Sequence, residues 1–188
     1  TMQKYTVSFL GRDCPGVVST VSSLLSDAGC NIVAATQSLL LGEFAGIFLV
    51  SVDDSSTCEM IQEKLRSGIK NVNMDLSIIV RPTNEEEWGK TIHCEPFVVS
   101  ADGLDGSGQI AKISRVFTRH GVNVESLRAF LGEGVENHAL FVFEIMVPDS
   151  VDLGRLRREL VCEGQGLGLR VSVQHRDIFE AVHRIGTF

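Results

Sequence analysis

The turn Arg12-Asp13-Cys14-Pro15-Gly16 holds the residue types whose spacing best suits the recognition of a ligand. Asp13 can accept hydrogen bonds from the free amides of a helix that starts after the turn, and Pro15 presets the backbone for that start. Gly16 lets another group approach the backbone closely. Two interpretations stay open: a well-formed helix N-terminus, or a small site for a carboxylate or phosphate, which helix amides and the helix dipole favour.

No group of residues in the sequence indicates catalytic chemistry. The five cysteines are odd in number, widely spaced and without a Cys-x-x-Cys pair, which suits a reducing, cytoplasmic compartment. Cys14, in the turn and beside the expected helix N-terminus, is either a redox-sensing thiolate or a small side chain at an unconstrained position. The histidines lack ligand spacing, apart from the adjacent His93 and Cys94, and no Ser/His/Asp or Cys/His set recurs. We therefore expect no catalytic residues, no metal and no cofactor.

A repeat in the sequence indicates how the turn is positioned. Shifting the chain by 92 residues aligns identical residues in one register, which indicates a duplicated unit. Between the identities, apolar residues recur at spacings of three and four, so each copy should carry a helix, at 16–28 and at 108–120. The identical residues are Val7, Ser8, Gly11, Asp13, Gly16, Ser22, Gly29 and Asn31, which match Val99, Ser100, Gly103, Asp105, Gly108, Ser114, Gly121 and Asn123.

Strand and turn signals around these helices give each copy the order βαββαβ, with a second helix capped by Ser or Asp. We expect an α+β fold of two ferredoxin-like units, each an antiparallel four-stranded sheet with both helices on one face. The expected organisation is a first unit at 3–81, a linker at 82–94, a second unit at 95–176, and a short C-terminal helix and tail at 177–188.

Units of this size leave sheet edges and one sheet face open. We expect the two units to pair within the chain, or two chains to pair as a homodimer.

The second copy of the turn also resembles a dinucleotide fingerprint. Residues 106–111 read G-x-G-x-x-A at a helix start. The first copy has Cys14, Gly16 and Ser19 at the same positions, so the glycine pattern is not a property of the unit, which is also too short for a parallel doubly wound sheet. We therefore exclude a nucleotide cofactor.

Composition excludes two classes of partner. The formal net charge is -7 and the pI is about 5.2, whereas a nucleic-acid binder needs an excess of Lys and Arg along the phosphates. We therefore expect no direct binding to nucleic acid. The sequence also has neither an apolar run of membrane-spanning length nor a signal-like N-terminus, so we expect no association with a membrane.

The order of elements and the turn D-x-P-G, followed by a helix and G-x-N-I, resemble the ACT domain. GRDCPGVVSTVSSLLSDAGCNIVAATQ carries the resemblance, and DGLDGSGQIAKISRVFTRHGVNVESL carries a weaker version. ACT domains are regulatory modules that commonly bind amino acids. A chain of two such units without a catalytic domain is similar to the family of glycine cleavage system transcriptional repressors.

This resemblance implies a non-enzymatic regulatory protein that binds an amino acid of the glycine or serine class and signals through contact with another protein. The alternative is a structural or oligomer-forming module whose ligand site has lapsed.

The turn itself indicates where such an amino acid would lie, because free amides and the helix dipole coincide there. Its carboxylate would meet the amides of Gly16, Val17 and Val18, and its ammonium group would meet Asp13 and Asn31. A weaker second site is expected because Pro15 is matched by Ser107 and Val17 by Gln109. The expected sites comprise Arg12, Asp13, Cys14, Pro15, Gly16, Val17, Val18, Asn31 and Ile32 in the first unit, and Asp105, Gly106, Ser107, Gly108, Gln109, Asn123 and Val124 in the second.

Overall fold

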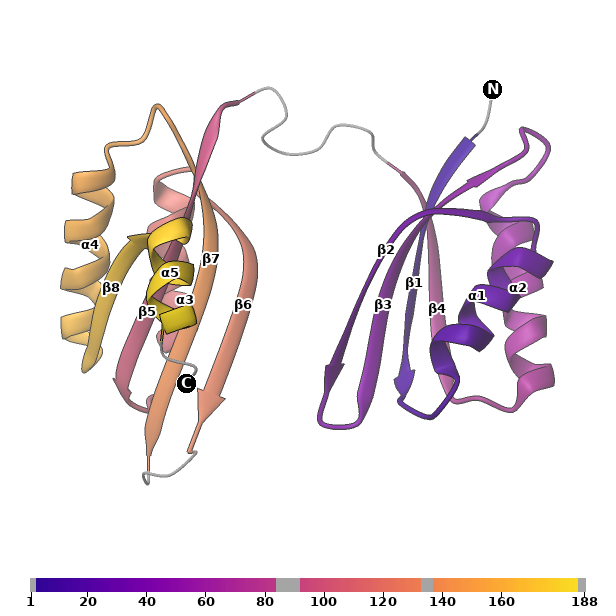
Figure 1. The fold of residues 1–188 in the computed structure, drawn as a ribbon, viewed down its shortest axis with the longest axis horizontal. Helices are drawn as coiled ribbons and strands as arrows, with labels where there is room; N and C mark the ends of the chain where they lie inside the picture. Colours follow the sequence, from indigo (N-terminus) through magenta and orange to yellow (C-terminus); the bar gives the residue numbers. More distant parts are fainter. Residues whose placement is uncertain (1–2, 84–91, 133–136, 186–188) are drawn as a thin grey trace. The chain divides into compact units, whose positions relative to one another are not determined.

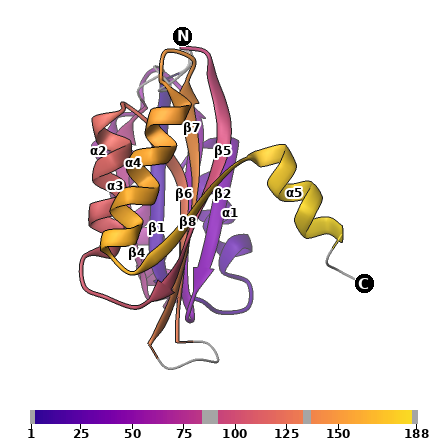
Figure 2. The ribbon, with the colours of Figure 1, turned by 90° about the vertical axis from the view of Figure 1, so that its left-hand side faces the viewer.

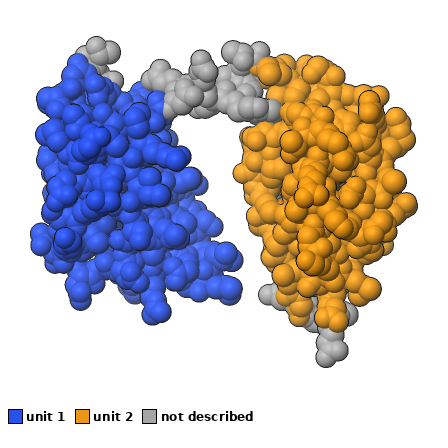
Figure 3. Space-filling model, turned by 180° about the vertical axis from the view of Figure 1, so that it is seen from behind, with its two compact units in different colours: residues 1–85 blue, residues 86–188 orange. Residues whose placement is uncertain are grey.

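The structure is a computed structural model that describes residues 3–83, 92–132 and 137–185. The chain divides into two compact units, residues 1–85 and 86–188, each described here by itself (Figures 1 and 3). The division falls inside the stretch expected as a linker, of which residues 84–91 lie outside the described part of the chain.

Unit 1 has the predicted order βαββαβ, and its sheet has the strand order β2-β3-β1-β4 with antiparallel pairs throughout. Gly16 precedes the first helix, and a run of apolar residues at helical spacing follows it. The second helix is capped by Thr57, whose side chain accepts from the Met60 amide, rather than by Ser or Asp. The elements are β1 (Gln3–Arg12), α1 (Val17–Asp27), β2 (Asn31–Leu40), β3 (Glu43–Val52), α2 (Cys58–Val72) and β4 (Leu76–Pro82).

Unit 2 repeats the order, with the strand order β6-β7-β5-β8, so the predicted fold class is confirmed. Its second helix is capped by Asp152, which accepts from the Arg155 amide. The elements are β5 (Cys94–Leu104), α3 (Gln109–Arg119), β6 (Asn123–Leu131), β7 (His138–Pro148), α4 (Leu153–Gly166), β8 (Leu169–His175) and a further helix, α5 (Arg176–Ile185).

Each unit has its own hydrophobic core between its sheet and its pair of helices. In unit 2, α5 packs on β5 and β8, on the side of the sheet opposite α3 and α4 (Figure 2). Val98 and Val142 point to that side because their strand neighbours face the core, yet they are only 2% and 8% exposed. The open sheet face of unit 2 is therefore partly covered by its own chain.

Two glycines of the repeat are required by a close backbone approach. A Cβ at Gly11 would collide with the carbonyl oxygen of Asp75, and one at Gly103 would collide with that of Gly168. In both units the end of the first strand thus lies against the loop before the last strand, and only glycine leaves enough room.

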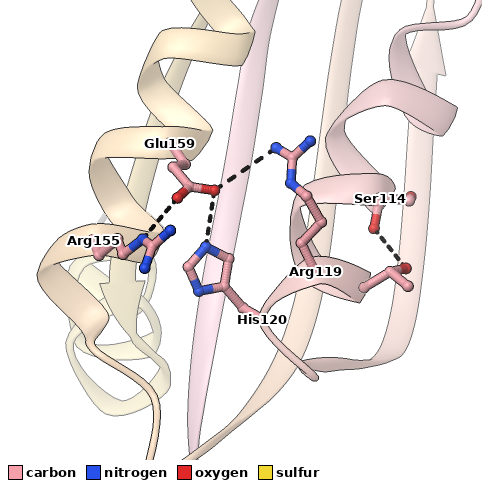
Figure 4. Close-up of polar contacts among 6 residues, drawn as sticks. Ser114, Arg119, His120, Arg155 and Glu159 are labelled. Carbon is pink, nitrogen blue, oxygen red and sulfur yellow. Dashed lines mark hydrogen bonds and ion pairs between the residues drawn. The ribbon is translucent and has the colours of Figure 1, made fainter.

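A polar cluster joins the two core helices of unit 2 (Figure 4). His120, at the end of α3, is 11% exposed, and its Nε2 lies 3.0 Å from Oε2 of Glu159 on α4. Arg155 Nε donates to Glu159 Oε1 at 3.0 Å, and Arg119 Nη2 lies 3.7 Å from Oε2. The hydrogen bond from His120 lowers the pKa of Glu159 most, and the hydrogen bond from Arg155 lowers it further. In unit 1 the end of α1 is joined to α2 differently, by Lys64 Nζ donating to the Ala28 carbonyl at 3.4 Å.

We expect Gly103→Ala to destabilise unit 2 by about 1–3 kcal/mol, because the opposing atom belongs to backbone and cannot rotate away. Urea unfolding measures this change. Gly166→Ala, at the end of α4, is the control, because its Cβ would meet nothing within 4 Å. Equal stability of the two variants would contradict the close approach.

We also expect Glu159→Gln to lower the melting temperature at pH 7. The folded-state pKa of Glu159 lies below the ordinary value of 4.5, so its ionised form stabilises the fold above that pH. This contribution is lost as the pH falls through the folded-state pKa, and the difference between the variant and the native chain should shrink below pH 4.5. Glu163→Gln, one turn further along α4, removes the same charge without breaking the cluster. The contrary result would be a difference in melting temperature between Glu159→Gln and the native chain that stays constant as the pH is lowered until the carboxylates are protonated.

Candidate functional site

The turn between β1 and α1 is held by backbone hydrogen bonds on both sides. The Arg12 amide donates to the Asp75 carbonyl at 3.2 Å, and the Asp13 amide donates to the Gly42 carbonyl at 2.9 Å. The first bond ties the turn to the loop before β4, and the second ties it to the tip of the β2–β3 hairpin. The turn is therefore built on a fixed frame at one end of the unit 1 sheet.

Gly16 is the N-cap of α1 and has a left-handed backbone, with φ of 87°. The expected capping role of Asp13 is wrong, because α1 has no side-chain cap hydrogen bond and Asp13 is exposed. A Cβ at Gly16 would meet nothing within 4 Å, so the α-carbon faces open space. Gly16 is thus explained first by its backbone conformation, which non-glycine residues rarely adopt, and it also leaves an open approach to the turn.

The three amides expected to receive a carboxylate are not equivalent. The Val17 amide already donates to the Cys14 carbonyl at 3.1 Å, and the Val17 side chain is buried. The Gly16 carbonyl accepts from the Thr20 amide at 2.9 Å, as the first bond of the helix requires. The amides of Gly16 and Val18 remain as the first-turn donors that a helix cannot satisfy internally.

Cys14 and Pro15 complete the turn. Cys14 is half-buried and packs against the hydrophobic core, as a small apolar side chain does, whereas Pro15 is exposed. This packing favours the structural interpretation of Cys14 over that of a redox-sensing thiolate.

A small pocket of about 180 Å³ adjoins the start of α1. Val18 contributes from the helix, Phe48 from β3, and a segment of β2 from the sheet edge. The pocket is small compared with the roughly 300–1,000 Å³ of drug-sized sites, so it suits a ligand of few atoms. The contributing β2 residues, which sequence reasoning missed, are Ala35, Thr36 and Gln37.

Asn31 and Ile32 do not lie beside the turn of their own unit. Asn31 pairs with Ser51, which pairs with Lys4, whereas Arg12 pairs with Glu43 at the other end of the same strands. The eight residue-to-residue steps from Lys4 to Arg12 span roughly 26 Å at about 3.3 Å each. The expected joint role of Asp13 and Asn31 of one unit is therefore wrong. If both contact one ligand, they come from different ACT-like units.

The strand that carries Asn31 forms an edge of the sheet and is exposed along all ten residues. The run 31–42 contains no Asp, Glu, Lys or Arg. The opposite edge strand, β4, ends in Arg81 and Pro82, which are residues that discourage pairing at an edge. This absence of charged residues can be seen in the sequence, and it makes β2 the edge strand better suited to pairing with another strand.

The turn of unit 2 has the same frame but different contents. The Asp105 amide donates to the Asn137 carbonyl at 2.7 Å, and Gly108 is left-handed with φ of 76°. Asp105, Gly106, Ser107 and Gly108 are exposed, whereas Gln109 is buried. Asn123 and Val124 again lie at the far end of the sheet, at the start of β6.

Unit 2 has two further polar clusters, one beside this turn and one at the start of β5. Asp102 holds His138 Nε2 at 2.7 Å and Arg170 Nη2 at 3.1 Å on the sheet, and His93 pairs with Asp149 at 2.8 Å. Within the described ranges, no three His, Cys, Asp or Glu side chains gather as metal ligands would. Of the helices described, none combines the length and apolar character that crossing a membrane requires.

Comparison with known proteins identifies the first unit. Residues 5–78 match the family model of the ACT domain. A UPF0237 protein of Pyrobaculum aerophilum is 39% identical over 88 residues, which are 47% of this chain and 96% of that protein. The glycine cleavage system transcriptional repressor of Escherichia coli is 27% identical over 121 residues, which are 64% of this chain and 61% of that protein.

Solved structures extend the likeness in fold over both units. A protein of unknown role from Galdieria sulphuraria has a TM-score of 0.69 at 21% identity, covering 93% of this chain and 99% of that one. A candidate glycine cleavage system transcriptional repressor has a TM-score of 0.70 at 21% identity, covering 92% and 96%. At this identity they establish the βαββαβ fold alone. The chain belongs to the ACT-domain family, as shown by the family-model match over residues 5–78 and by the Pyrobaculum relative, of which the chain covers 96%.

Proposed function

We propose that the chain is a non-catalytic regulatory protein that binds a free amino acid at the turn of unit 1 and signals through contact with another protein. The observation that carries the proposal is the position of the small apolar pocket beside Val18, at a helix N-terminus that offers amides and an open approach at Gly16. The ligand carboxylate lies against the amides of Gly16 and Val18, where the helix dipole is favourable.

The ammonium group of the ligand needs acceptors, and Asp13 is the charged one on the turn. A second acceptor, Asn31, reaches the same site when β2 pairs antiparallel with β2 of a second copy of the chain. In that arrangement the start of one β2 lies beside the end of the other, near the Gly42 carbonyl to which the turn is bonded. The site is then completed by the dimer.

The ligand class follows from the relative named for the glycine cleavage system, so glycine and L-serine are the first amino acids to test. A pocket of about 180 Å³ admits side chains of this size. The five free cysteines suit a reducing compartment, and we place the protein in the cytoplasm.

A purely structural, oligomer-forming module is the alternative, and one observation favours it. Gly16 and Gly108 have the same left-handed backbone, so their presence in both units needs no ligand. The two functions differ in whether the turn of unit 1 responds to an amino acid.

The first prediction from this function is that glycine or L-serine raises the melting temperature in a thermal-shift screen of the amino acids, because a ligand of the folded state stabilises it by mass action. Asp13→Asn should then weaken binding in calorimetry. Loss of a hydrogen bond to a charged group costs about 1.5–3 kcal/mol, or roughly ten- to a hundredfold in affinity. Asp105→Asn in unit 2 is the matched control and should leave this affinity unchanged.

Gly16→Val is a poor test, because a β-branched residue is strained at a positive φ. Gly16→Ala and Gly108→Ala are better matched, since both introduce a Cβ at a left-handed residue facing open space. Only the unit 1 variant should lose binding. If no amino acid shifts the melting temperature and Asp13→Asn behaves as the native chain, the oligomer-forming alternative is preferred.

A second prediction concerns pairing. Sedimentation of the native chain should give a dimer, and Thr36→Lys should give a monomer. Thr36 lies near the middle of β2, so in a symmetric antiparallel pair the two lysines would approach each other across the two-fold axis and repel. Ser77→Lys adds the same charge to the other sheet edge, β4, and should stay dimeric. A native monomer, or a dimeric Thr36→Lys variant, would overturn pairing through β2.

A further inference from the structure

The two core helices of unit 2 carry a positive charge, although the chain as a whole is negative. α3 contains three basic residues and no acidic one, and α4 contains three basic and two acidic residues, so six basic and two acidic side chains give the helices a formal charge of +4. The formal charge of the whole chain is -7. We call this surface the α3–α4 face. Its basic side chains are all exposed, and they are Lys112, Arg115, Arg119, Arg155, Arg157 and Arg158.

The fold itself does not require this charge. In unit 1 the corresponding helices, α1 and α2, contain three basic and three acidic residues, so their formal charge is zero. On α3, Lys112, Arg115 and Arg119 follow one another at spacings of three and four, which places them along one stripe of the helix. Like charges at these spacings repel each other and destabilise a helix. The stripe therefore weakens the fold slightly unless anions lie beside it.

The cluster at Glu159 neutralises only part of this charge. Glu159 lies between Arg119 of α3 and Arg155 of α4 (Figure 4). A guanidinium group has five N–H donors. Glu159 accepts a hydrogen bond from Nε of Arg155, whereas its distance of 3.7 Å from Nη2 of Arg119 is too long for one. The side chains of Arg119 and Arg155 are 58% and 68% exposed, so both guanidinium groups are accessible to a further carboxylate.

Two adjoining hollows, of about 480 and 300 Å³, lie at this cluster. Arg119 and Glu159 line both of them, so the hollows follow the seam between α3 and α4. Arg155 lines the larger hollow, and Lys112 lines the smaller one. A partner can therefore place side chains between the two helices, where cationic groups of both helices reach them.

The charges along the seam favour one kind of partner. A guanidinium group can bind a carboxylate through two parallel hydrogen bonds, so Arg119 and Arg155 suit Asp and Glu side chains. Nucleic acid presents a continuous row of phosphates and is less suited, because Glu159 and Glu163 lie in the same seam and the chain is negative overall. A peptide can place carboxylates at the arginines and neutral residues at the glutamates.

We propose that the α3–α4 face of unit 2 is the surface through which the chain contacts its partner protein, and that it recognises an acidic segment of that protein. Clusters of arginine are a recurring means of recognising acidic segments. This inference rests on the proposed function, of which it specifies the protein contact, and it does not depend on which amino acid the turn of unit 1 binds.

Fluorescence anisotropy with a labelled peptide of alternating glutamate and serine tests this surface in the full chain. We expect the native chain to bind the peptide at low salt and to bind it more weakly as the salt concentration rises, because salt screens exposed charges. The same peptide with glutamine in place of glutamate should not bind. Arg119→Gln/Arg155→Gln should weaken binding of the glutamate peptide about three- to tenfold, as the loss of two exposed ion pairs implies.

A second pair of substitutions keeps the test valid if the first pair disturbs folding. Lys112→Gln/Arg115→Gln removes the same charge from the α3–α4 face without touching the Glu159 cluster, and it should also weaken binding. Arg66→Gln/Lys70→Gln is the matched control, because it removes two exposed basic side chains from α2 of unit 1. The control changes the net charge equally and should leave the affinity unchanged.

Three results would overturn the inference: no binding of the glutamate peptide by the native chain at low salt, unchanged affinity in both variants of the α3–α4 face, or equal weakening in the unit 1 control. Duplex DNA that binds more tightly than the peptide, through the same arginines, would overturn the acidic protein segment as the occupant. Calorimetry with glycine separates this surface from the amino-acid site. Glycine binding without peptide binding overturns this inference alone, whereas peptide binding without a response to any amino acid contradicts the amino-acid site and supports this surface.

Discussion

The backbone contacts at the end of the first strand are the constraint on which each unit depends. In unit 1, Gly11 brings β1 against the Asp75 carbonyl, and the next residues donate to Asp75 and Gly42. The direction in which the chain leaves the sheet is thereby set, and the left-handed Gly16 then turns it into α1. The helix amides, the open approach and the apolar pocket all follow from this one junction. A shift of the junction would move the candidate site together with the packing of α1 on the sheet.

The two units share this junction and differ in what surrounds it. Unit 1 has Val17 at its helix start, an uncharged exposed edge in β2 and a pocket at Val18. Unit 2 has a hydrogen-bonded Gln109 at its helix start and a helix, α5, on its open sheet face. In unit 2 the helix start is thus hydrogen-bonded to its surroundings through Gln109, and the sheet face is partly covered by α5.

The order of elements could be predicted from the repeat, because glycines at turns and apolar residues at helical spacing are local signals. The limits of the first helices were predicted to within one residue for the same reason. Which residues come together at the site was harder to predict. Asn31 follows the turn closely in sequence, but a helix and the strand direction carry it to the opposite end of the sheet. The exchange of Val17 for Gln109 was visible in the repeat, whereas the hydrogen bond from the Gln109 carboxamide to the Leu167 carbonyl joins chain segments far apart in sequence.

The central claim is that the turn of unit 1 binds a small amino acid. An NMR titration of the native, isotope-labelled chain with glycine, repeated with L-serine, tests it most directly, because every backbone amide reports its own environment. The account predicts saturable shifts of the amides of Asp13, Gly16 and Val18. Shifts confined to residues 105–109, or no saturable shift at residues 12–18 with either amino acid, would contradict it.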